Sequence, residues 1–382
     1  MTQPVQPEWK VPLFDLDFGD AERDAVLRVL SSRWLTMGPE TEAFEREFAA
    51  FLGVPHAVAV SNGTAALHLA YLALGLSAGD EVLMPSLTFV ATANAAAVCG
   101  AKPVFAEIAG EDDLTVSAED LARRITPRTR AIAVMHYGGH ACDMTPILAL
   151  AARHRLPVVE DAAHAVAATH GKLPCGTLGV LGCFSFFSNK NLAMGEGGMV
   201  VTRDPALAAR LRSLRSHGMV AVAWDRQRGH GYTNDVATPG FNYRMDEIRA
   251  ALGRVQLAGL AARQARRAAV VARYRSRLAS LPGLGVPFPS LRGTPGHHLQ
   301  AVLLPKGADR SGVMDGLKAR GIQSNIHYPP VHRFSAYHEA GLALPVTERV
   351  TDRLLTLPLH SRMDASAVDT VCNALEEALV PA

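Results

Sequence analysis

The chain has 382 residues, of which 48% are hydrophobic and 19% are charged. This composition supplies enough apolar material for a folded core and excludes a chain kept disordered by its charge. Lysine and arginine number 38 and aspartate and glutamate 36, so the formal net charge of +2 indicates neither nucleic acid nor an anionic membrane as a partner. At roughly 150 residues per domain, the length predicts two domains, or three.

The first half of the chain alternates between short β-prone runs and helical stretches. Two helices are predicted near the N-terminus, at about 21–32 and 40–51. The predicted strands are 56–60, 81–84, 103–107, 131–136, 157–160 and 199–202, and the predicted helices between them are 65–74, 90–99, 118–124 and 145–154. Strands that alternate with helices of this length indicate an α/β fold with a mainly parallel sheet covered on both faces.

The pattern changes after Gly240. Residues 245–277 are mostly helix formers, with Gly253 and Gly259 as weak points, and they predict one long helix or two end to end. After a segment rich in glycine and proline, the predicted elements are a strand at 300–304, a helix at 310–320, a β-prone piece at 322–328 and a helix at 365–379. We therefore expect a large domain at 12–250, which includes the N-terminal covering helices. A linking helix and a smaller C-terminal α+β domain follow at 251–382.

The cysteines and the N-terminal segment bear on the compartment. The five cysteines are spread out and form no Cys-x-x-Cys pair: Cys99, Cys142, Cys175, Cys183 and Cys372. This pattern favours reduced thiols over a disulfide framework or a zinc cluster. No basic region followed by an apolar run opens the chain, and the longest weakly polar stretch, at about 92–101, is too short to span a bilayer. We expect a cytoplasmic protein.

The most informative stretch is 182–198, in which Lys190 lies between an aromatic run and a glycine-rich turn. Apolar surroundings disfavour the ammonium form, so this lysine could be partly neutral and form an imine with an aldehyde. Taken alone, Lys190 fits a solvent-facing lysine beside a turn better, because most lysines are exposed.

Asp161 ends the predicted strand upstream of that lysine. Ligands of α/β proteins bind at the carboxyl ends of parallel strands. A carboxylate there can hold a protonated pyridine nitrogen, whose charge makes the ring an electron sink. Taken alone, Asp161 is also consistent with the N-cap of a helix.

Two further segments follow predicted strands. The small-residue turn at 61–67 would point free backbone N–H groups and a helix dipole at an anion such as a phosphate. Phe89, in the segment 85–89, could stack on a heterocycle. Each segment also has a plain alternative: the turn can be an ordinary capped helix start, and Phe89 can be a core residue. Together with the lysine and the carboxylate, they match the four contacts expected for pyridoxal 5'-phosphate (PLP): an amine, an acid, a phosphate-binding turn and a stacking ring.

Six motifs together resemble the DegT/DnrJ/EryC1/StrS family of PLP-dependent sugar aminotransferases: SNGTAAL, PSLTFVATANA, VVEDAAHA, FSFFSNKNLAMGEGGMVVT, GFNYRMDEIRAALGRVQL and HYPPVH. The resemblance runs from about residue 12 to the C-terminus. It implies an aspartate-aminotransferase-like (type I) PLP fold and a homodimer with shared active sites. The implied reaction moves an amino group from an amino acid, L-glutamate by analogy, to a nucleotide-linked keto-sugar in amino-sugar biosynthesis.

The resemblance also implies roles for single residues. Lys190 is similar to the catalytic lysine that forms a Schiff base with PLP, and Asp161 to the partner of the pyridine nitrogen. The other implied cofactor contacts are Gly63, Thr64 and Ser185 at the phosphate, Phe89 on the ring, His164 near the 3'-oxygen, and Asn242 reaching the neighbouring subunit's cofactor phosphate.

Substrate contacts are less strongly indicated. In the basic stretch 212–230, Arg226 and Arg228 are candidates for a nucleotide diphosphate, because arginine forks suit phosphate oxygens; a solvated helix end and loop is the alternative. His327, Tyr328 and His332 are candidates for the sugar pocket on family resemblance, or ordinary loop residues. The Phe-Ser-Asn segment before Lys190 departs from the commonest family pattern and leaves the substrate contacts on that side open.

No metal site is expected, because Gly138 and Gly139 argue against a helix that would place His136 and His140 on one face. Three alternative functions stay open: an aminotransferase acting on a cyclitol ketone, a sugar dehydratase, and a non-catalytic PLP-fold regulator. In the family, dehydratases carry histidine in place of the lysine. The lysine at position 190 therefore favours amino transfer.

Overall fold

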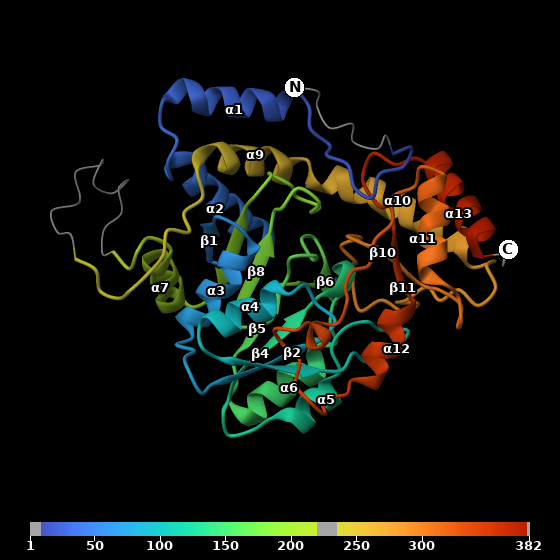
Figure 1. Ribbon diagram of the computed structural model, residues 1–382. Coiled ribbons are helices and arrows are strands. Elements are labelled where there is room, and N and C mark those ends of the chain that lie inside the picture. Colours follow the sequence, from blue (N-terminus) through green and yellow to red (C-terminus); the bar gives the residue numbers. More distant parts are fainter. Residues whose placement is uncertain (1–8, 220–234, 380–382) are drawn as a thin grey trace.

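The structure is a computed structural model that describes residues 9–219 and 235–379. A seven-stranded sheet with the order β1–β9–β8–β5–β4–β2–β3 forms its centre (Figure 1). Its strands are β1 (His56–Val60), β2 (Glu81–Pro85), β3 (Lys102–Ala106), β4 (Thr129–Met135), β5 (Val158–Asp161), β8 (Leu181–Ser185) and β9 (Gly198–Thr202). Of these seven, only β9 runs opposite to the rest, since it pairs antiparallel with both β1 and β8. The predicted mainly parallel sheet is therefore confirmed.

Helices cover both faces of this sheet (Figure 1). They are α2 (Pro39–Leu52), α3 (Gly63–Ala73), α4 (Ala91–Val98), α5 (Ala118–Arg124), α6 (Met144–His154) and α7 (Pro205–Arg215). Helix α1 (Asp20–Ser32) instead packs on the helix at Glu247–Ala258. Strand β4 shows the two faces directly. Ala131 and Ala133 pack with residues of α3 and α4, whereas Ile132 and Val134 pack with residues of α5 and α6. This alternation follows from the two-residue period of a strand.

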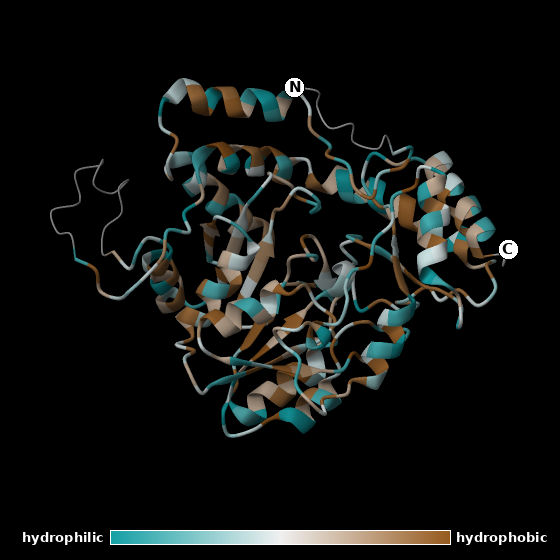
Figure 2. Ribbon diagram, in the orientation of Figure 1, coloured by the Kyte–Doolittle hydropathy of each residue, from teal (hydrophilic) through white to brown (hydrophobic). Residues whose placement is uncertain are grey.

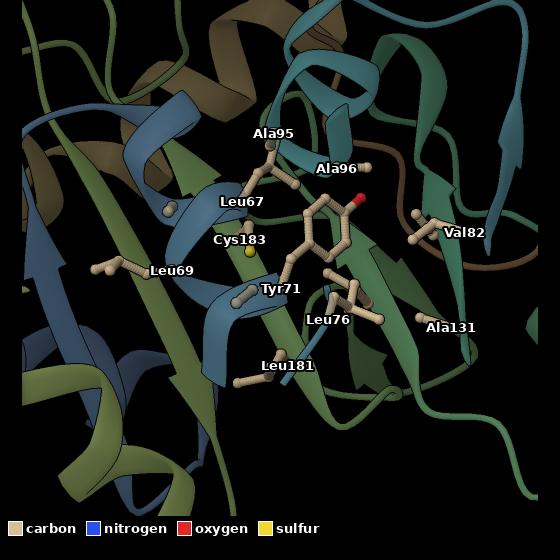
Figure 3. Packing of buried hydrophobic residues seen from close by; sticks show 14 of the residues in the cluster. Leu67, Leu69, Tyr71, Leu76, Val82, Ala95, Ala96, Ala131, Leu181 and Cys183 are labelled. Atoms are coloured by element: carbon tan, nitrogen blue, oxygen red, sulfur yellow. The ribbon is translucent and has the colours of Figure 1, made fainter. Parts of the chain in front are cut away.

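The core beneath α3 is built around Tyr71, whose side chain is fully buried. Figure 3 shows its ring among Leu76, which follows α3, Val82 of β2, and Ala95 and Ala96 of α4. The alanines of α4 leave room for this large ring beside the sheet. Full burial of a side chain of this size contributes on the order of 2 kcal/mol to folding.

Strand β8 was not among the predicted strands, although it carries the segment that leads to Lys190. Gly182 weakens the strand signal, because glycine has low strand propensity. The structure shows why glycine is needed there. A Cβ at this position would lie 2.0 Å from the carbonyl oxygen of Gly176. The close approach of two backbone segments, which the sequence pattern does not reveal, requires this residue.

Two helices lie end to end after the central sheet, α9 (Glu247–Ala258) and α10 (Leu260–Leu278), as one of the two sequence interpretations predicts. They meet at Gly259. Helix α9 packs on α1 through a small apolar cluster, whereas most buried apolar residues of α10 belong to a separate core. The domain boundary at 250/251 stays a prediction.

That separate core contains a two-stranded antiparallel sheet of β10 (Gln300–Leu303) and β11 (Leu354–Leu357). The helices of this part are α11 (Arg310–Ala319), α12 (Pro345–Arg353) and α13 (Ala365–Leu379). Short elements elsewhere are η1 (Tyr137–Gly139), β6 (Thr169–His170), β7 (Leu173–Pro174) and η2 (Val331–Arg333). The predicted final helix agrees with α13.

The β-prone piece at 322–328 does not form a strand, which corrects that prediction. Its backbone makes single bridges, one of them from Asn325 to Thr356, and β11 occupies the place beside β10. The physical reason lies at the end of the segment, where Tyr137 of the large sheet's edge donates a hydrogen bond to the carbonyl of His327. The segment therefore connects the two sheets instead of extending one.

Hydropathy follows this architecture. In Figure 2 the central strands are largely brown, whereas the outer helices carry both colours. This is the pattern of a sheet buried on both faces under amphipathic helices. Among the described residues, none of the helices combines the length and the apolar composition that a membrane span needs.

Candidate active site

The carboxyl ends of β1, β2, β5 and β8 lie at one edge of the sheet, because these strands run in the same direction. Asp161 is the last residue of β5, and Ser185 is the last residue of the adjacent β8. Lys190 lies in the turn that follows β8. Topology thus brings together residues that the sequence analysis selected one at a time.

Lys190 is half-buried, and its backbone N–H closes the turn by donating to the carbonyl of Phe187 at 2.8 Å. Burial lowers the pKa of Lys190 to about 8, and the negative charge of Asp161 acts in the opposite direction. With a pKa of about 8, about a tenth of the amines are neutral at pH 7, against less than about a thousandth for an ordinary lysine. The side chain is therefore available as a nucleophile near neutral pH.

Asp161 is buried and accepts two hydrogen bonds. Its Oδ2 accepts from the hydroxyl of Thr92 at 2.7 Å, and its Oδ1 accepts from the backbone N–H of Ala163 at 3.1 Å. Burial raises the pKa of Asp161, while these two hydrogen bonds and the charge of Lys190 lower it. It ends a strand and caps no helix, so the N-cap alternative is wrong. Within residues 9–219 and 235–379, no cation lies close enough to pair with it.

Phe89 extends from the turn after β2 and is 51% exposed, so it is not a core residue. Its ring lies 5.5 Å from the ring of Tyr328, with 50° between the planes. The carbonyl of Phe89 accepts from the N–H of Thr92 at 3.3 Å. The turn therefore presents an aromatic face and leads into α4, where Thr92 carries the hydroxyl that holds Asp161. Thr92 was missed in the sequence analysis, because a threonine in a predicted helix gives no signal by itself.

His164 is buried in a defined tautomer. The N–H of Gly138 donates to its Nδ1 at 3.4 Å, so the proton lies on Nε2 and points at the hydroxyl oxygen of Tyr328, 3.0 Å away. Burial lowers the pKa of His164 well below its ordinary value, and the charge of Lys190 lowers it further. The ring is neutral at physiological pH.

His298 also borders the site and was missed, since no motif surrounds it. Its ring centre lies 4.2 Å from that of His164, and its Nδ1 lies 3.1 Å from Oδ1 of Asn191. The amide nitrogen of Asn191 donates to Gln264, so its oxygen accepts from His298. Nε2 of His298 therefore carries a lone pair, and it is buried without a partner among the described residues.

An anion site lies at the start of α3. Asn62 caps the helix by accepting from the N–H of Ala65 at 2.8 Å. The N–H groups of Gly63 and Thr64 open the helix and have no intrahelical acceptor. A Cβ on Gly63 would lie 2.8 Å from the Cβ of Ser185. Glycine thus lets the helix start approach the end of β8.

The residues present fit PLP. A buried carboxylate without a counter-ion suits a pyridine N–H, and an amine of lowered pKa suits an aldehyde. A free helix N-terminus beside a serine hydroxyl suits a phosphate. The exposed ring of Phe89 is free to stack on a heterocycle.

For three predicted residues, the part of the chain that the structure describes shows no contact with this cluster. Asn242 is exposed, and its backbone forms a bridge with Ser216. Arg226 and Arg228 lie outside the described residues. In the same basic stretch, Arg215 is buried and paired with Glu45 at 2.5 Å, so it serves the core instead of a nucleotide.

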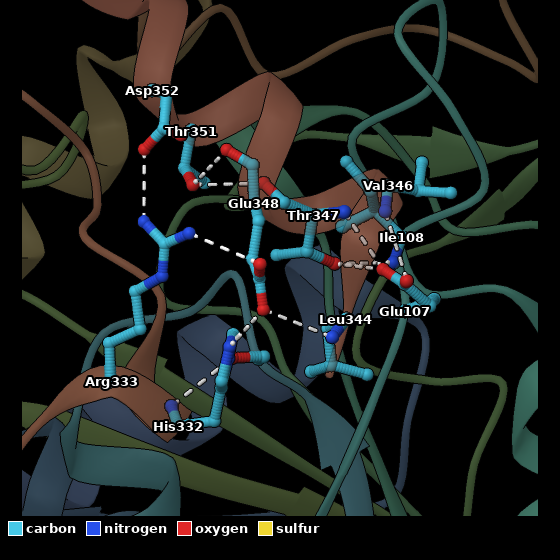
Figure 4. A network of polar contacts seen from close by, with 11 residues as sticks. Glu107, Ile108, His332, Arg333, Leu344, Val346, Thr347, Glu348, Thr351 and Asp352 are labelled. Atoms are coloured by element: carbon cyan, nitrogen blue, oxygen red, sulfur yellow. Dashed lines mark hydrogen bonds and ion pairs between the residues drawn. The ribbon is translucent and has the colours of Figure 1, made fainter. Parts of the chain in front are cut away.

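The C-terminal candidates differ from one another. Tyr328 lies between Phe89 and His164, as a site residue should. His327 is buried, with its Nδ1 3.0 Å from the hydroxyl of Thr356, and burial lowers its pKa to about 4. His332 is buried and both of its ring nitrogens are engaged, so neither is free for a sugar (Figure 4).

A pocket borders Lys190 on the side of the small sheet. It is lined by Leu13, Phe14, Asn189, His298, Leu299, His327, Thr356, Leu357 and Leu359. Asn189 precedes the lysine, and the lysine's charge lowers the pKa of both lining histidines. None of these side chains carries a charge at neutral pH, and Oδ1 of Asn189 has no partner among the described residues.

Known proteins are similar to this chain over most of its length. Residues 17–376 match the DegT/DnrJ/EryC1/StrS aminotransferase family. The chain belongs to this family. The spore coat polysaccharide biosynthesis protein SpsC of Bacillus subtilis (strain 168) is 41% identical over 370 residues, which are 94% of each chain.

Solved structures extend the comparison for this DegT/DnrJ/EryC1/StrS aminotransferase. S. venezuelae DesV, in complex with a ketimine intermediate, is 39% identical with a TM-score of 0.89 over 96% of this chain and 98% of that one. DesI, in the presence of its TDP-sugar product, is 33% identical with a TM-score of 0.88 over 98% of this chain and 93% of that one. The expected type I PLP fold is confirmed, and the chain is an enzyme of the PLP-dependent aminotransferase class.

Proposed function

We propose that this enzyme moves an amino group from an amino acid, L-glutamate by family resemblance, to the keto group of a nucleotide-linked sugar. The observation that carries the proposal is the pairing of Lys190, with its pKa of about 8, and the buried carboxylate of Asp161 at adjacent strand ends. The names of two relatives support the sugar. DesI is described with a TDP-sugar product, and SpsC with the biosynthesis of a polysaccharide.

Bound PLP supplies an aldehyde that carries the amino group and a ring that withdraws electrons from the reacting carbon. We assign to Nζ of Lys190 the covalent attachment of this cofactor and, once released, the transfer of a proton to and from the substrate carbon. A pKa of about 8 suits both tasks, because the amine can both lose and regain a proton near neutral pH.

We assign to Asp161 the task of keeping the ring nitrogen protonated. Thr92 and Ala163 each hold one of its oxygens, so the carboxylate has a fixed orientation. The other proposed cofactor contacts are Phe89 on the ring face, His164 near the 3'-oxygen, and Gly63, Thr64 and Ser185 at the phosphate. His164 is neutral and its proton is directed at Tyr328, so it leaves the charge balance of the site unchanged.

The uncharged pocket beside Asn189 favours a sugar at this side of the site. Its free amide oxygen and neutral histidines can accept hydrogen bonds from hydroxyl groups, whereas a carboxylate would find no cation among the residues that line it. In this proposal the nucleotide extends away from the pocket, and Arg226 and Arg228 contact its diphosphate.

The covalent attachment is tested by mapping it. The protein is incubated with PLP, reduced with borohydride, digested and analysed by mass spectrometry. We expect the added mass on the peptide that contains Lys190 and its absence in Lys190→Ala, while the exposed Lys172→Ala keeps it. Prior treatment with L-glutamate should lower the yield of labelled peptide. A label on another lysine would overturn the assignment.

The acceptor is tested with protein loaded with pyridoxamine phosphate. Regeneration of the PLP absorbance by nucleotide-linked keto-sugars, and not by free keto-sugars, is the expected result. Regeneration by a cyclitol ketone alone would replace the sugar in our proposal, and no regeneration by any ketone would favour a regulator. Reversing the charge at Arg226 and Arg228 should raise the KM for the nucleotide sugar.

We also propose a homodimer in which Asn242 contacts the neighbouring subunit's cofactor phosphate. Mixed dimers provide the test. Lys190→Ala and Asn242→Ala are each expected to be impaired, but a mixed dimer contains one site with both residues intact. Activity recovered on mixing and refolding the two variants would support the shared site. A mixture no more active than the sum of its parts would contradict it.

A further inference from the structure

A chain of buried hydrogen bonds lies next to the site without entering it. Ser86 follows β2, and its Oγ lies 2.6 Å from Nδ1 of His332. Nε2 of the same ring lies 3.0 Å from Oε1 of Glu348, in the first turn of α12. Figure 4 shows the histidine and the glutamate facing each other across this part of the molecule.

The direction of each bond follows from the donors available. The carboxylate of Glu348 can only accept, so Nε2 of His332 carries the proton and Nδ1 is left as an acceptor. The hydroxyl of Ser86 therefore donates to Nδ1. Glu348 is itself held, because it accepts from the N–H of Leu344 at 3.1 Å and pairs with Arg333 at 3.2 Å.

This serine–histidine–glutamate series has the polarity of a hydrolase triad, but its surroundings exclude that role. Ser86 is fully buried, and its Oγ also accepts from the N–H of His332 at 3.3 Å. Its backbone carbonyl accepts from the N–H of Val331 at 2.9 Å. A hydroxyl that no substrate can reach, and that is engaged on both sides, fixes positions instead of attacking a bond.

The contact between Ser86 and His332 fixes two segments that enter the site from opposite sides. On one side Ser86 leads in three residues to Phe89, through a turn closed by the N–H of Thr88 on the carbonyl of Ser86 at 3.1 Å. On the other side His332 follows Tyr328 with two prolines between them. Proline restricts φ to a narrow range, so this connection is stiff and a shift at His332 moves Tyr328.

We propose that His332 is a positioning residue, which joins the turn after β2 to the segment 327–332 and so sets the spacing between Phe89 and Tyr328. The proposal rests on the proposed function, since those two aromatic side chains then contact the cofactor and His164. The geometry behind it is the 2.6 Å contact with Ser86, together with the 5.5 Å between the two aromatic rings.

The test measures the affinity of the apoprotein for PLP by fluorescence titration, with circular dichroism of the bound cofactor as a second readout. Ser86→Ala removes the donor. His332→Gln can keep a donor toward Glu348 but places no acceptor where Nδ1 of the histidine lies, whereas His332→Asn can keep an acceptor there and loses the contact with Glu348. We expect the first two variants to weaken PLP binding about tenfold and to reduce the dichroic band. His332→Asn should stay within about threefold of the unsubstituted protein.

Thr347→Val is the matched structural control. Thr347 is buried in the same first turn of α12, and it donates to Glu107 at 2.5 Å without touching the segment 327–332. We expect this variant to lower the melting temperature while the PLP affinity stays within about twofold. If His332→Gln does not fold, Ser86→Ala carries the test alone, since it removes a single oxygen atom.

Two results would overturn the inference. One is PLP affinity that falls in all four variants in proportion to their loss of thermal stability. The other is unchanged affinity and dichroism in both Ser86→Ala and His332→Gln. Failure of the proposed function is a separate outcome, because it would appear as no PLP binding in the unsubstituted protein.

Discussion

Two neighbouring carboxylates on β5 differ in how completely they are hydrogen-bonded. Glu160 and Asp161 point to opposite faces of the sheet, because successive strand residues alternate. Both are buried. Glu160 accepts from His136 and from three backbone N–H groups, those of Gly176, Leu178 and Gly179, at 2.6–2.8 Å.

Asp161 accepts from only two donors, Thr92 and Ala163. A carboxylate has about four acceptor sites, so Glu160 is saturated and Asp161 keeps capacity for a ligand. Burial alone therefore does not identify the functional acid. The hydrogen-bonding capacity that remains after folding distinguishes the two, and in our proposal it marks Asp161 as the functional acid.

The largest effect is expected at Lys190, not at either of these two acids. Lys190→Ala should lower the rate of amino transfer by about a thousandfold or more, because both the covalent attachment and the proton transfer depend on its Nζ. The visible absorbance of bound PLP should be lost as well. Lys172→Ala, at an exposed lysine, is the control, and a Lys190→Ala enzyme that turns over normally would refute the role.

Exchanging the two acids for amides should separate function from stability. Asp161→Asn should reduce activity by about a hundredfold or more while the melting temperature is kept or raised, because a buried charge without a counter-ion is removed. Glu160→Gln should keep the chemistry but lower the free energy of unfolding by about 2–4 kcal/mol, because amide hydrogens would face backbone donors. Urea denaturation and steady-state kinetics measure both. The comparison fails if the two variants behave alike.

The pH dependence should report on Lys190. Only the neutral amine reacts with an aldehyde, so the rate at which apoprotein captures PLP should rise about tenfold per pH unit below pH 8. Above that pH the rate should level off, since the amine is then mostly neutral. Stopped-flow absorbance measures this. A rate that keeps rising to pH 10 would mean that burial does not lower the pKa of Lys190.

The smallest effect is expected from Thr92→Val, which removes one of the two donors to Asp161. The pKa of Asp161 should rise, since the Thr92 hydrogen bond lowers it. PLP affinity should fall about three- to tenfold. Thr88→Val is the control, because its hydroxyl lies 3.2 Å from that of Thr92 and does not contact Asp161. Equal losses in both variants would assign the effect to packing.

Local patterns in the sequence predicted much of the fold. The strand at 56–60 and the helices at 118–124 and 365–379 agree with β1, α5 and α13, because each combines a clear period with turn residues at its ends. The segment 322–328 has strand-like composition, but it meets β11 in a single bridge from Asn325 to Thr356, and only the assembled structure shows this. Propensity describes a segment, whereas pairing depends on its neighbours.

By itself the sequence indicated the chemistry that we propose for the enzyme: a lysine after an aromatic run, an acid at the end of a predicted strand, and a small-residue turn before a helix. These signals are local, so they can be read along the chain. Only the tertiary structure decided which carboxylate keeps free hydrogen-bonding capacity and which further residues, Thr92 and His298, border the site. It also decided that His332 positions the segments around the site. Each of these depends on contacts between residues far apart in sequence, which the order of the residues does not display.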